Sequence, residues 1–221
     1  MGTTSAKRAR QPVRRPRRSE GDRAARRRRR PEEAEGEILA AAERFLRTRP
    51  FRDLQVGALM DGTGLRRSSF YHYFRGRHDL VVRLLAKLTD GLAPQSERWF
   101  GAEQDPVASL RAGYEGIGRF WAEHGPVLRA IADAATHDRV VEKAHRAFVD
   151  RFARGTAARI RADIERGRIA PLDADESARA LILMSESFLN EKLGREPQRD
   201  WRNTIDTLAT LWQRALYGES R

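Results

Sequence analysis

The sequence contains no cysteine, and this absence excludes several kinds of chemistry. A chain of 221 residues without cysteine has no disulfide framework, no thiolate zinc site and no thiol nucleophile. Prolines number only 9, and no uncharged apolar run approaches the ~18 residues that a membrane span needs. We therefore expect a soluble, cytoplasmic protein with a packed core and no membrane partner.

The motifs of common enzymes and metal sites are also missing. The five histidines form neither an HExxH pattern nor a pair spaced four residues apart. There is no GxxxxGK[ST] phosphate loop, and no GxGxxG follows a predicted strand. We expect no catalytic residue, no metal ligand and no cofactor, and hence no enzyme.

Positive charge is concentrated at the N-terminal end of the chain. The formal net charge is +12, and residues 1–30 alone hold thirteen Lys and Arg against two acidic residues, while the remainder is nearly balanced. This segment has few apolar residues and is interrupted by prolines, so burial cannot offset the entropy of ordering it. We expect residues 1–31 to form a disordered, Arg-rich arm.

Three interpretations of this arm compete. A phosphate-binding arm would add salt-sensitive affinity for nucleic acid. A targeting peptide needs an amphipathic helix, which the five consecutive arginines and the prolines do not allow. The sequence favours the phosphate-binding arm and leaves open an inert leader or a mis-assigned start.

After Pro31 the apolar spacing is helical to the end of the chain, which predicts an all-α fold. Helices are expected at about 33–48 and about 55–62. A Gly62-Thr63-Gly64 turn follows, and a third short helix opens at about Arg67. A short helix, a glycine-containing turn and a second short helix are typical of the helix-turn-helix motif. Residues 32–77 are therefore predicted to be a three-helix DNA-binding domain.

The periodicity assigns the faces of the third helix. Phe70 and Phe74 point together into the domain core, whereas Ser68 and His72 point the opposite way. The N-terminal residues of the second helix of such motifs meet base edges, and arginine, serine and tyrosine also bind phosphate oxygens. The predicted contacts to double-stranded DNA are Arg66, Arg67, Ser68, Ser69, Tyr71, His72, Tyr73, Arg75 and Arg77.

These residues resemble the DNA-binding domain of TetR-family transcriptional repressors. The resemblance is carried, in order and spacing, by Ile38 to Leu46, Gly64 to Phe74, and Arg77 to Leu80 with Leu84-Leu85. The last residues are similar to the end of the mycobacterial ethionamide-resistance repressor subgroup. Two features depart from the family: Gln55 and Arg66 replace the usual Ser or Thr helix caps, and Gly57 lies inside the second helix, which predicts a less stable domain.

Residues 78–221 are predicted to form a helical effector-binding and dimerisation domain. Pro94 is expected to break or kink the fourth helix, and Pro126 to precede a separate short helix. A long helix is expected to end at Gly167, and Asp173 to cap the next one. The last two helices carry apolar residues on more than one face, which predicts a homodimer interface, with packing inside the chain as the alternative. The resemblance implies a four-helix bundle between two subunits, and such a dimer would read a palindrome.

Aromatic stripes in this domain indicate either plain core or a pocket for an apolar ligand, and the resemblance implies the pocket. The predicted ligand-binding residues are Leu110, Tyr114, Ile117, Trp121, Phe148, Phe152, Thr156, Ile182, Ser185, Phe188 and Trp212. Amides that anchor ligands in the relatives correspond here to Ile182 and Ser185. The identity of the ligand therefore does not carry over.

Together these patterns predict a ligand-responsive repressor. It would bind a palindromic operator as a homodimer and be released by a small hydrophobic effector. The alternative is an architectural or RNA-binding helical dimer that relies on the basic arm. A third hypothesis is a ligand-binding scaffold whose DNA-binding domain has degenerated.

Overall fold

The computed structural model describes residues 31–101, 105–196 and 200–218, and within these ranges it contains eight α-helices and no strand. The expected all-α fold is therefore confirmed. Residues 1–30 of the predicted arm lie outside the described part. Among the described residues, no helix is both long enough and apolar enough to cross a membrane.

Three helices and one 3-10 turn form the N-terminal unit, residues 31–76. They are α2 (Pro31–Leu46), the 3-10 turn η1 (Phe51–Asp53), α3 (Val56–Asp61) and α4 (Arg67–Tyr73). Each α-helix agrees with the expected one to within two residues. The core of the N-terminal unit is apolar and fully buried, and includes Ile38, Leu46, Leu54, Phe70 and Phe74. The unit therefore has the three-helix architecture that the sequence predicts.

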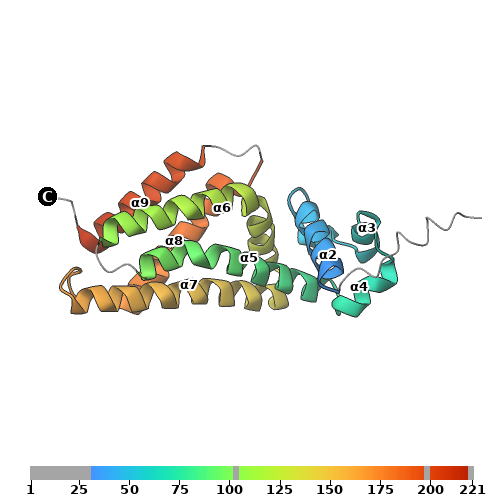
Figure 1. Cartoon of the computed structure of the whole chain (residues 1–221), viewed down its shortest axis with the longest axis horizontal. Coiled ribbons are helices and arrows are strands. Elements are labelled where there is room, and N and C mark those ends of the chain that lie inside the picture. Colours follow the sequence, from blue (N-terminus) through green and yellow to red (C-terminus); the bar gives the residue numbers. More distant parts are fainter. Residues whose placement is uncertain (1–30, 102–104, 197–199, 219–221) are drawn as a thin grey trace, which may run out of the picture.

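A single long helix, α5 (Arg77–Phe100), leaves the N-terminal unit and enters the rest of the molecule (Figure 1). It begins directly after Gly76. Pro94 does not end it, since the helix continues through Pro94 and places Trp99 in a buried position. Proline removes one backbone donor, and packing along the helix compensates for that loss.

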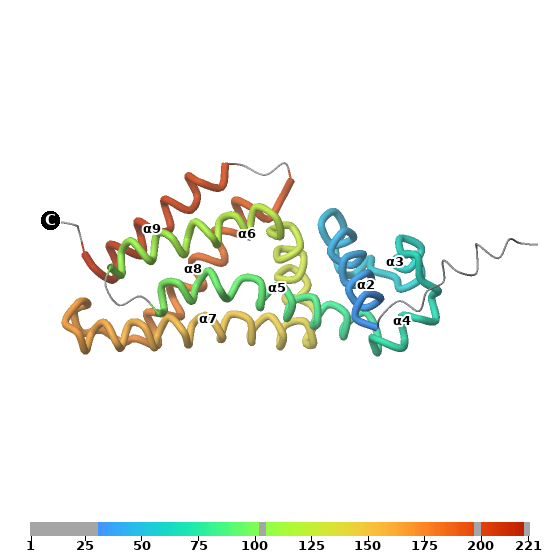
Figure 2. The backbone as a smooth tube through the Cα atoms, in the orientation of Figure 1, coloured from blue at the N-terminus to red at the C-terminus, as the bar shows by residue number. Residues whose placement is uncertain are grey.

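The C-terminal unit, residues 77–218, adds four helices to α5. They are α6 (Pro106–Ala135), α7 (Arg139–Glu165), α8 (Ala174–Leu193) and α9 (Trp201–Tyr217). Helix α5 packs along α6 and α7, α6 packs along α9, and α7 packs along α8. Figure 2 shows these long helices lying side by side, with the second half of α6 next to α2 of the N-terminal unit.

The expectation of a separate helix after Pro126 was wrong. Helix α6 runs without interruption through Pro126, and Figure 1 shows it changing direction in its second half. Pro126 cannot donate a hydrogen bond and therefore bends the helix. Val127 and Ile131 beyond it are fully buried, so packing holds the second half in place.

Aspartates cap the later helices, whereas the two short N-terminal helices lack side-chain caps. The Asp173 carboxylate accepts hydrogen bonds from two backbone N–H groups of the first turn of α8, as predicted. Gly167, with φ of 68°, follows the end of α7 in the left-handed conformation that favours glycine. Gln55 and Arg66, in contrast, make no side-chain cap bond to α3 and α4.

Candidate nucleic-acid interface and ligand pocket

One face of α4 is open to solvent and the opposite face is buried. Phe70 and Phe74 lie in the core, while Tyr71 exposes 58% of its surface and His72 is also exposed. Arg66, Arg67 and Ser68 precede them on the same exposed surface. The orientation of α4 therefore agrees with the helical periodicity, and the cations and hydroxyls stand where a DNA duplex has access.

The other predicted DNA contacts lie at the edge of this surface. Ser69 and Tyr73 are half-buried on the flanks of α4, and Arg75 is exposed. Arg77 is turned back onto η1, because its guanidinium lies 5.1 Å from the Phe51 ring centroid and donates to the Arg52 carbonyl at 3.2 Å. The structure thus groups eight of the nine residues on or beside the exposed face.

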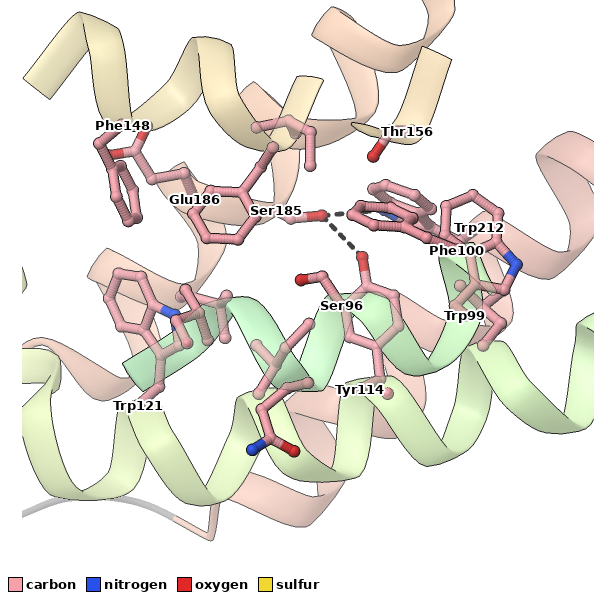
Figure 3. A pocket seen from close by; sticks show the side chains of 18 residues that line it. Ser96, Trp99, Phe100, Tyr114, Trp121, Phe148, Thr156, Ser185, Glu186 and Trp212 are labelled. Atoms are coloured by element: carbon pink, nitrogen blue, oxygen red, sulfur yellow. Dashed lines mark hydrogen bonds between the residues drawn. The ribbon is translucent and has the colours of Figure 1, made fainter. Parts of the chain in front are cut away.

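A pocket opens inside the C-terminal unit, between α5, α6, α7, α8 and α9 (Figure 3). Its cavity volume is about 80 Å³. Ten of the eleven predicted ligand-binding residues line the pocket. The exception is Phe188, which is half-buried and lies beneath the Lys192 ammonium, 5.4 Å away. The lining residues that sequence reasoning missed are Leu92, Gln95, Ser96, Trp99, Phe100, Gly113, Glu186 and Leu189.

Three side chains form a polar cluster in this apolar wall (Figure 3). Trp212 Nε1–H donates to Ser185 Oγ at 2.9 Å, and the Tyr114 hydroxyl lies 3.0 Å from the same oxygen. Burial raises the pKa of Tyr114 far above its usual value, and the bond to Ser185 opposes this only in part. Tyr114 is therefore a neutral hydroxyl at any physiological pH.

One ionisable acid also lines the pocket. Glu186 Oε1 lies 2.5 Å from Nε2 of His145, and the His145 ring stacks on Phe148. A carboxylate in apolar surroundings requires such a partner. The pair escaped sequence reasoning because its members lie 41 positions apart, on α7 and α8.

A buried ionic network contacts the pocket wall at Trp99 and Phe100. Arg159 Nε donates to Asp163 at 2.8 Å, and the Tyr217 hydroxyl donates to the same carboxylate at 2.7 Å. Trp99 Nε1–H donates in turn to the Tyr217 oxygen at 3.2 Å. Burial, together with the neighbouring Asp163, raises the pKa of Tyr217 to about 12. The network therefore ties the ends of α5, α7 and α9 to one another.

The described residues provide two candidate binding sites, the exposed face of α4 and the pocket. The described residues contain no cluster of three or more His, Cys, Asp or Glu side chains that would hold a metal ion. The structure presents an exposed, cationic helix face in the N-terminal unit and a largely apolar pocket in the C-terminal unit. Helix α5 runs between them.

Comparison with known proteins assigns both halves of the chain. The family model described as bacterial regulatory proteins, tetR family, matches residues 38–84. The model of the C-terminal domain of the transcriptional regulator EthR matches residues 110–218. The two matches correspond to the N-terminal helices with the start of α5, and to helices α6 to α9.

Relatives cover most of the chain. The HTH-type transcriptional regulator EthR of Mycobacterium tuberculosis (strain ATCC 25618 / H37Rv) is 33% identical over 189 residues, which is 83% of this chain and 87% of that protein. EthR of Mycolicibacterium smegmatis is 28% identical over 199 residues, 85% of this chain and 88% of that protein.

Solved structures have the same fold. A TetR-family transcriptional regulator from Rhodococcus sp. superposes with a TM-score of 0.71 at 17% identity, covering 84% of this chain and 99% of that one. The TetR-family regulator PfmR from Thermus thermophilus gives 0.66 at 20% identity, with 83% and 99% covered. The chain therefore belongs to the TetR family of helix-turn-helix, DNA-binding transcriptional regulators, with a C-terminal domain of the EthR type.

Proposed function

We propose that this protein is a ligand-responsive repressor that binds a palindromic operator as a homodimer and is released by a small hydrophobic effector. Residues 32–77 would read the DNA, residues 78–221 would bind the effector and dimerise, and the arm of residues 1–31 would add phosphate contacts. One observation carries the proposal. Helix α5 is separated from α4 by only three residues and ends with Trp99 and Phe100 in the wall of the pocket.

The unpaired apolar surface of the last two helices supports the dimer. Leu183 and Met184 of α8 expose 43% and 37% of their surfaces, and Leu211 of α9 exposes 45%. Large exposed aliphatic side chains on neighbouring helices are typical of an interaction site. A second copy of the chain would cover them with the same residues, as two-fold symmetry requires.

The polar cluster indicates the chemistry of the effector. Tyr114 and Ser185 together have two hydroxyl protons, and the bond between their oxygens uses one, while Trp212 supplies its own N–H. One hydroxyl proton therefore remains to donate to a ligand. We infer a narrow, apolar effector that carries one hydrogen-bond acceptor, such as a carbonyl oxygen.

The switch follows from linkage between the two sites. An effector releases DNA only if it binds better to the geometry that does not fit the operator. Coupling of this kind is typically ~1–3 kcal/mol, and DNA must weaken effector binding by the same factor. Helix α5 can carry the coupling because only three residues separate its start from the end of α4 and its other end lies in the wall of the pocket.

Selection of bound fragments from a randomised duplex pool tests the DNA-binding part of the proposal. We expect one symmetric sequence to be preferred over random duplex by a factor of ~10³ or more. Replacing Arg67 or Tyr71 by alanine should weaken binding to that sequence and leave the oligomeric state unchanged. The matched control, Arg146→Ala, removes a cation from the exposed face of α7 and should change neither. Equal affinity for random duplex or RNA would instead support the architectural or RNA-binding alternative.

A further inference from the structure

The N-terminal unit contacts helix α6 through polar side chains. Glu43 of α2 lies 2.5 Å from Nδ1 of His124, and both side chains are only 16% exposed. Arg47, which directly follows α2, donates to the backbone carbonyl of Glu123 at 2.8 Å. The C-terminal end of α2 and the residue after it therefore hold two consecutive residues of α6.

A second histidine–carboxylate pair crosses the same boundary at another point. His78, in the first turn of α5, lies 2.7 Å from Asp138, the residue that caps α7. The His78 ring also meets Phe51 of η1 edge-on, with the ring centroids 5.4 Å apart. His78 thus joins the N-terminal unit to the start of α7, as His124 joins it to α6.

Both carboxylates stay ionised well into the acidic range. The hydrogen bond from His124 lowers the pKa of Glu43 and outweighs burial, with smaller contributions from Lys87 and Arg47. Burial would raise the pKa of Asp138, but N–H bonds from Val141 and Val140 together with His78 lower it.

Other charges lie near each histidine. Glu123 of α6 approaches the other ring nitrogen of His124 at 3.7 Å. The cleft beside Asp138 is lined by Arg52, Arg77 and His137. Imidazoles in general change charge between pH 5 and 8, and a protonated imidazole beside an ionised carboxylate adds the attraction between opposite charges to the hydrogen bond.

The His124 contact also lies close to the pocket. Trp121, which lines the pocket, precedes His124 by three residues on α6, and both stand just before the bend at Pro126. Residues three apart on a helix lie on neighbouring turns of the same side. A displacement of Trp121 therefore moves His124, and with it the hydrogen bond to α2.

We propose that His124 and His78 are positioning residues, which set the orientation of the DNA-binding unit on the C-terminal unit through Glu43 and Asp138 and hold it more tightly when protonated. The two pairs act in parallel with α5. They make the position of the α4 face depend on pH as well as on the occupant of the pocket.

The absence of cysteine allows a direct test. Spin labels are placed on Asp61→Cys in α3 and Arg154→Cys in α7, both exposed positions, in the full chain without DNA or effector. Labelled protein is diluted into unlabelled protein, so that the distances measured by pulsed electron resonance lie within one chain. We expect the distance distribution to narrow as the pH falls from about 8 to about 6.

Amide substitutions separate positioning from general stability. Glu43→Gln and Asp138→Asn keep the size of each side chain, and asparagine still caps a helix. Each single variant should lose part of the pH response, and the double variant should lose all of it while remaining folded. Glu115→Gln is the matched control, because it removes the carboxylate from an exposed ion pair with Arg119 on the same helix α6.

Two results would overturn the proposal: a distribution in the parent protein that does not change with pH, or a double variant that still narrows at low pH. Since the measurement needs no DNA and no effector, its failure would leave the proposed repressor function standing. Conversely, a failed operator selection would not affect the distance result.

Discussion

A few polar atoms give the pocket its specificity, because the rest of its wall is apolar and will accept many shapes. Tyr114, Ser185 and Trp212 come from three different helices and meet at a single oxygen. A hydrogen-bond donor in such surroundings favours ligands with a matching acceptor, since a buried polar group left without a partner costs free energy. Whichever of the two hydroxyls donates to the other, one proton is left, and a single hydroxyl would keep its own, so both must be removed to lose this donor.

Tyr114→Phe combined with Ser185→Ala removes both hydroxyl protons and should therefore weaken binding of a long-chain ester about two- to tenfold, the effect of one hydrogen bond, and leave binding of an alkane of the same length almost unchanged. Quenching of the tryptophans that line the pocket, Trp99, Trp121 and Trp212, reports the affinity. Tyr71→Phe, on the exposed face of α4, is the control and should change neither value. Equal losses for ester and alkane would show that the Tyr114 and Ser185 hydroxyls act only through packing.

Glycine at position 57 lowers the stability of the DNA-binding unit without a steric need. A Cβ at Gly57 would lie 3.8 Å from the Arg67 guanidinium, an ordinary contact. Gly57→Ala should therefore raise the free energy of unfolding by about 0.5–1 kcal/mol, through helix propensity. Urea denaturation followed by circular dichroism measures this change.

Gly118→Ala provides the opposite case on α6. A Cβ there would overlap Trp201 and Ile205 of α9, and overpacking of this kind costs about 1–3 kcal/mol. If Gly57→Ala and Gly118→Ala change the free energy of unfolding in the same direction, then either helix propensity does not dominate at Gly57 or overpacking does not dominate at Gly118.

Among the helices, α9 depends on one hydroxyl near its C-terminal end. Tyr217 connects it to Asp163 of α7, which is fully buried, and to Trp99 of α5. Arg159 and Arg168 already pair with the same carboxylate. The contribution of Tyr217 is therefore a link between helices and not the neutralisation of a charge.

The raised pKa of Tyr217 makes this link sensitive to alkali. The usual pKa of a tyrosine side chain is 10.0, whereas that of Tyr217 in the folded chain is about 12, so the folded state prefers the protonated phenol. Its contribution to stability is complete below about pH 10 and is lost as the pH rises toward about 12. Tyr217→Phe should abolish this component of the pH dependence, measured by urea unfolding between those values. The Tyr71→Phe variant should keep this component of the pH dependence. Its loss in both variants would refute the assignment of the component to Tyr217.

For the molecule as a whole, the proposed reading of a palindrome requires a second chain. A single recognition helix contacts only a few base pairs, whereas two of them about one DNA turn apart, roughly 34 Å, read a palindrome. The exposed aliphatic residues of α8 and α9 are the surface that would hold two chains together. Substitution of these aliphatic residues should therefore weaken DNA binding indirectly, because it prevents two chains from associating.

Leu183→Asp combined with Leu211→Asp should convert the dimer to a monomer, because charges at the centre of an apolar interface cannot be solvated there. Sedimentation velocity measures the mass, and operator affinity should fall with it. Val140→Asp is the control: Val140 exposes 51% of its surface but lies at the start of α7. If the double variant is still a dimer, the interface lies elsewhere on the molecule.

The helices and their faces were predictable because helical periodicity is local. Phe70 and Phe74 fall on one side of α4, and the cap at Asp173 and the glycine at 167 depend only on neighbouring residues. Ten of the predicted ligand-binding residues line the pocket for the same reason, since residues on a core-facing stripe surround any space inside a helical bundle. Pro126 was misjudged because burial of the residues beyond it, which is not local, kept the helix continuous.

Local pattern thus determined the all-α architecture, the helix-turn-helix and its exposed face. Tertiary packing decided the pairs that join distant segments, such as Glu43 with His124, 81 positions apart, and Trp99 with Tyr217, 118 positions apart. It also turned Phe188 away from the pocket and brought Glu186 into it. The physical reason is that a helix repeats every 3.6 residues whatever surrounds it, whereas the rotation and crossing angle of two packed helices depend on all the side chains between them.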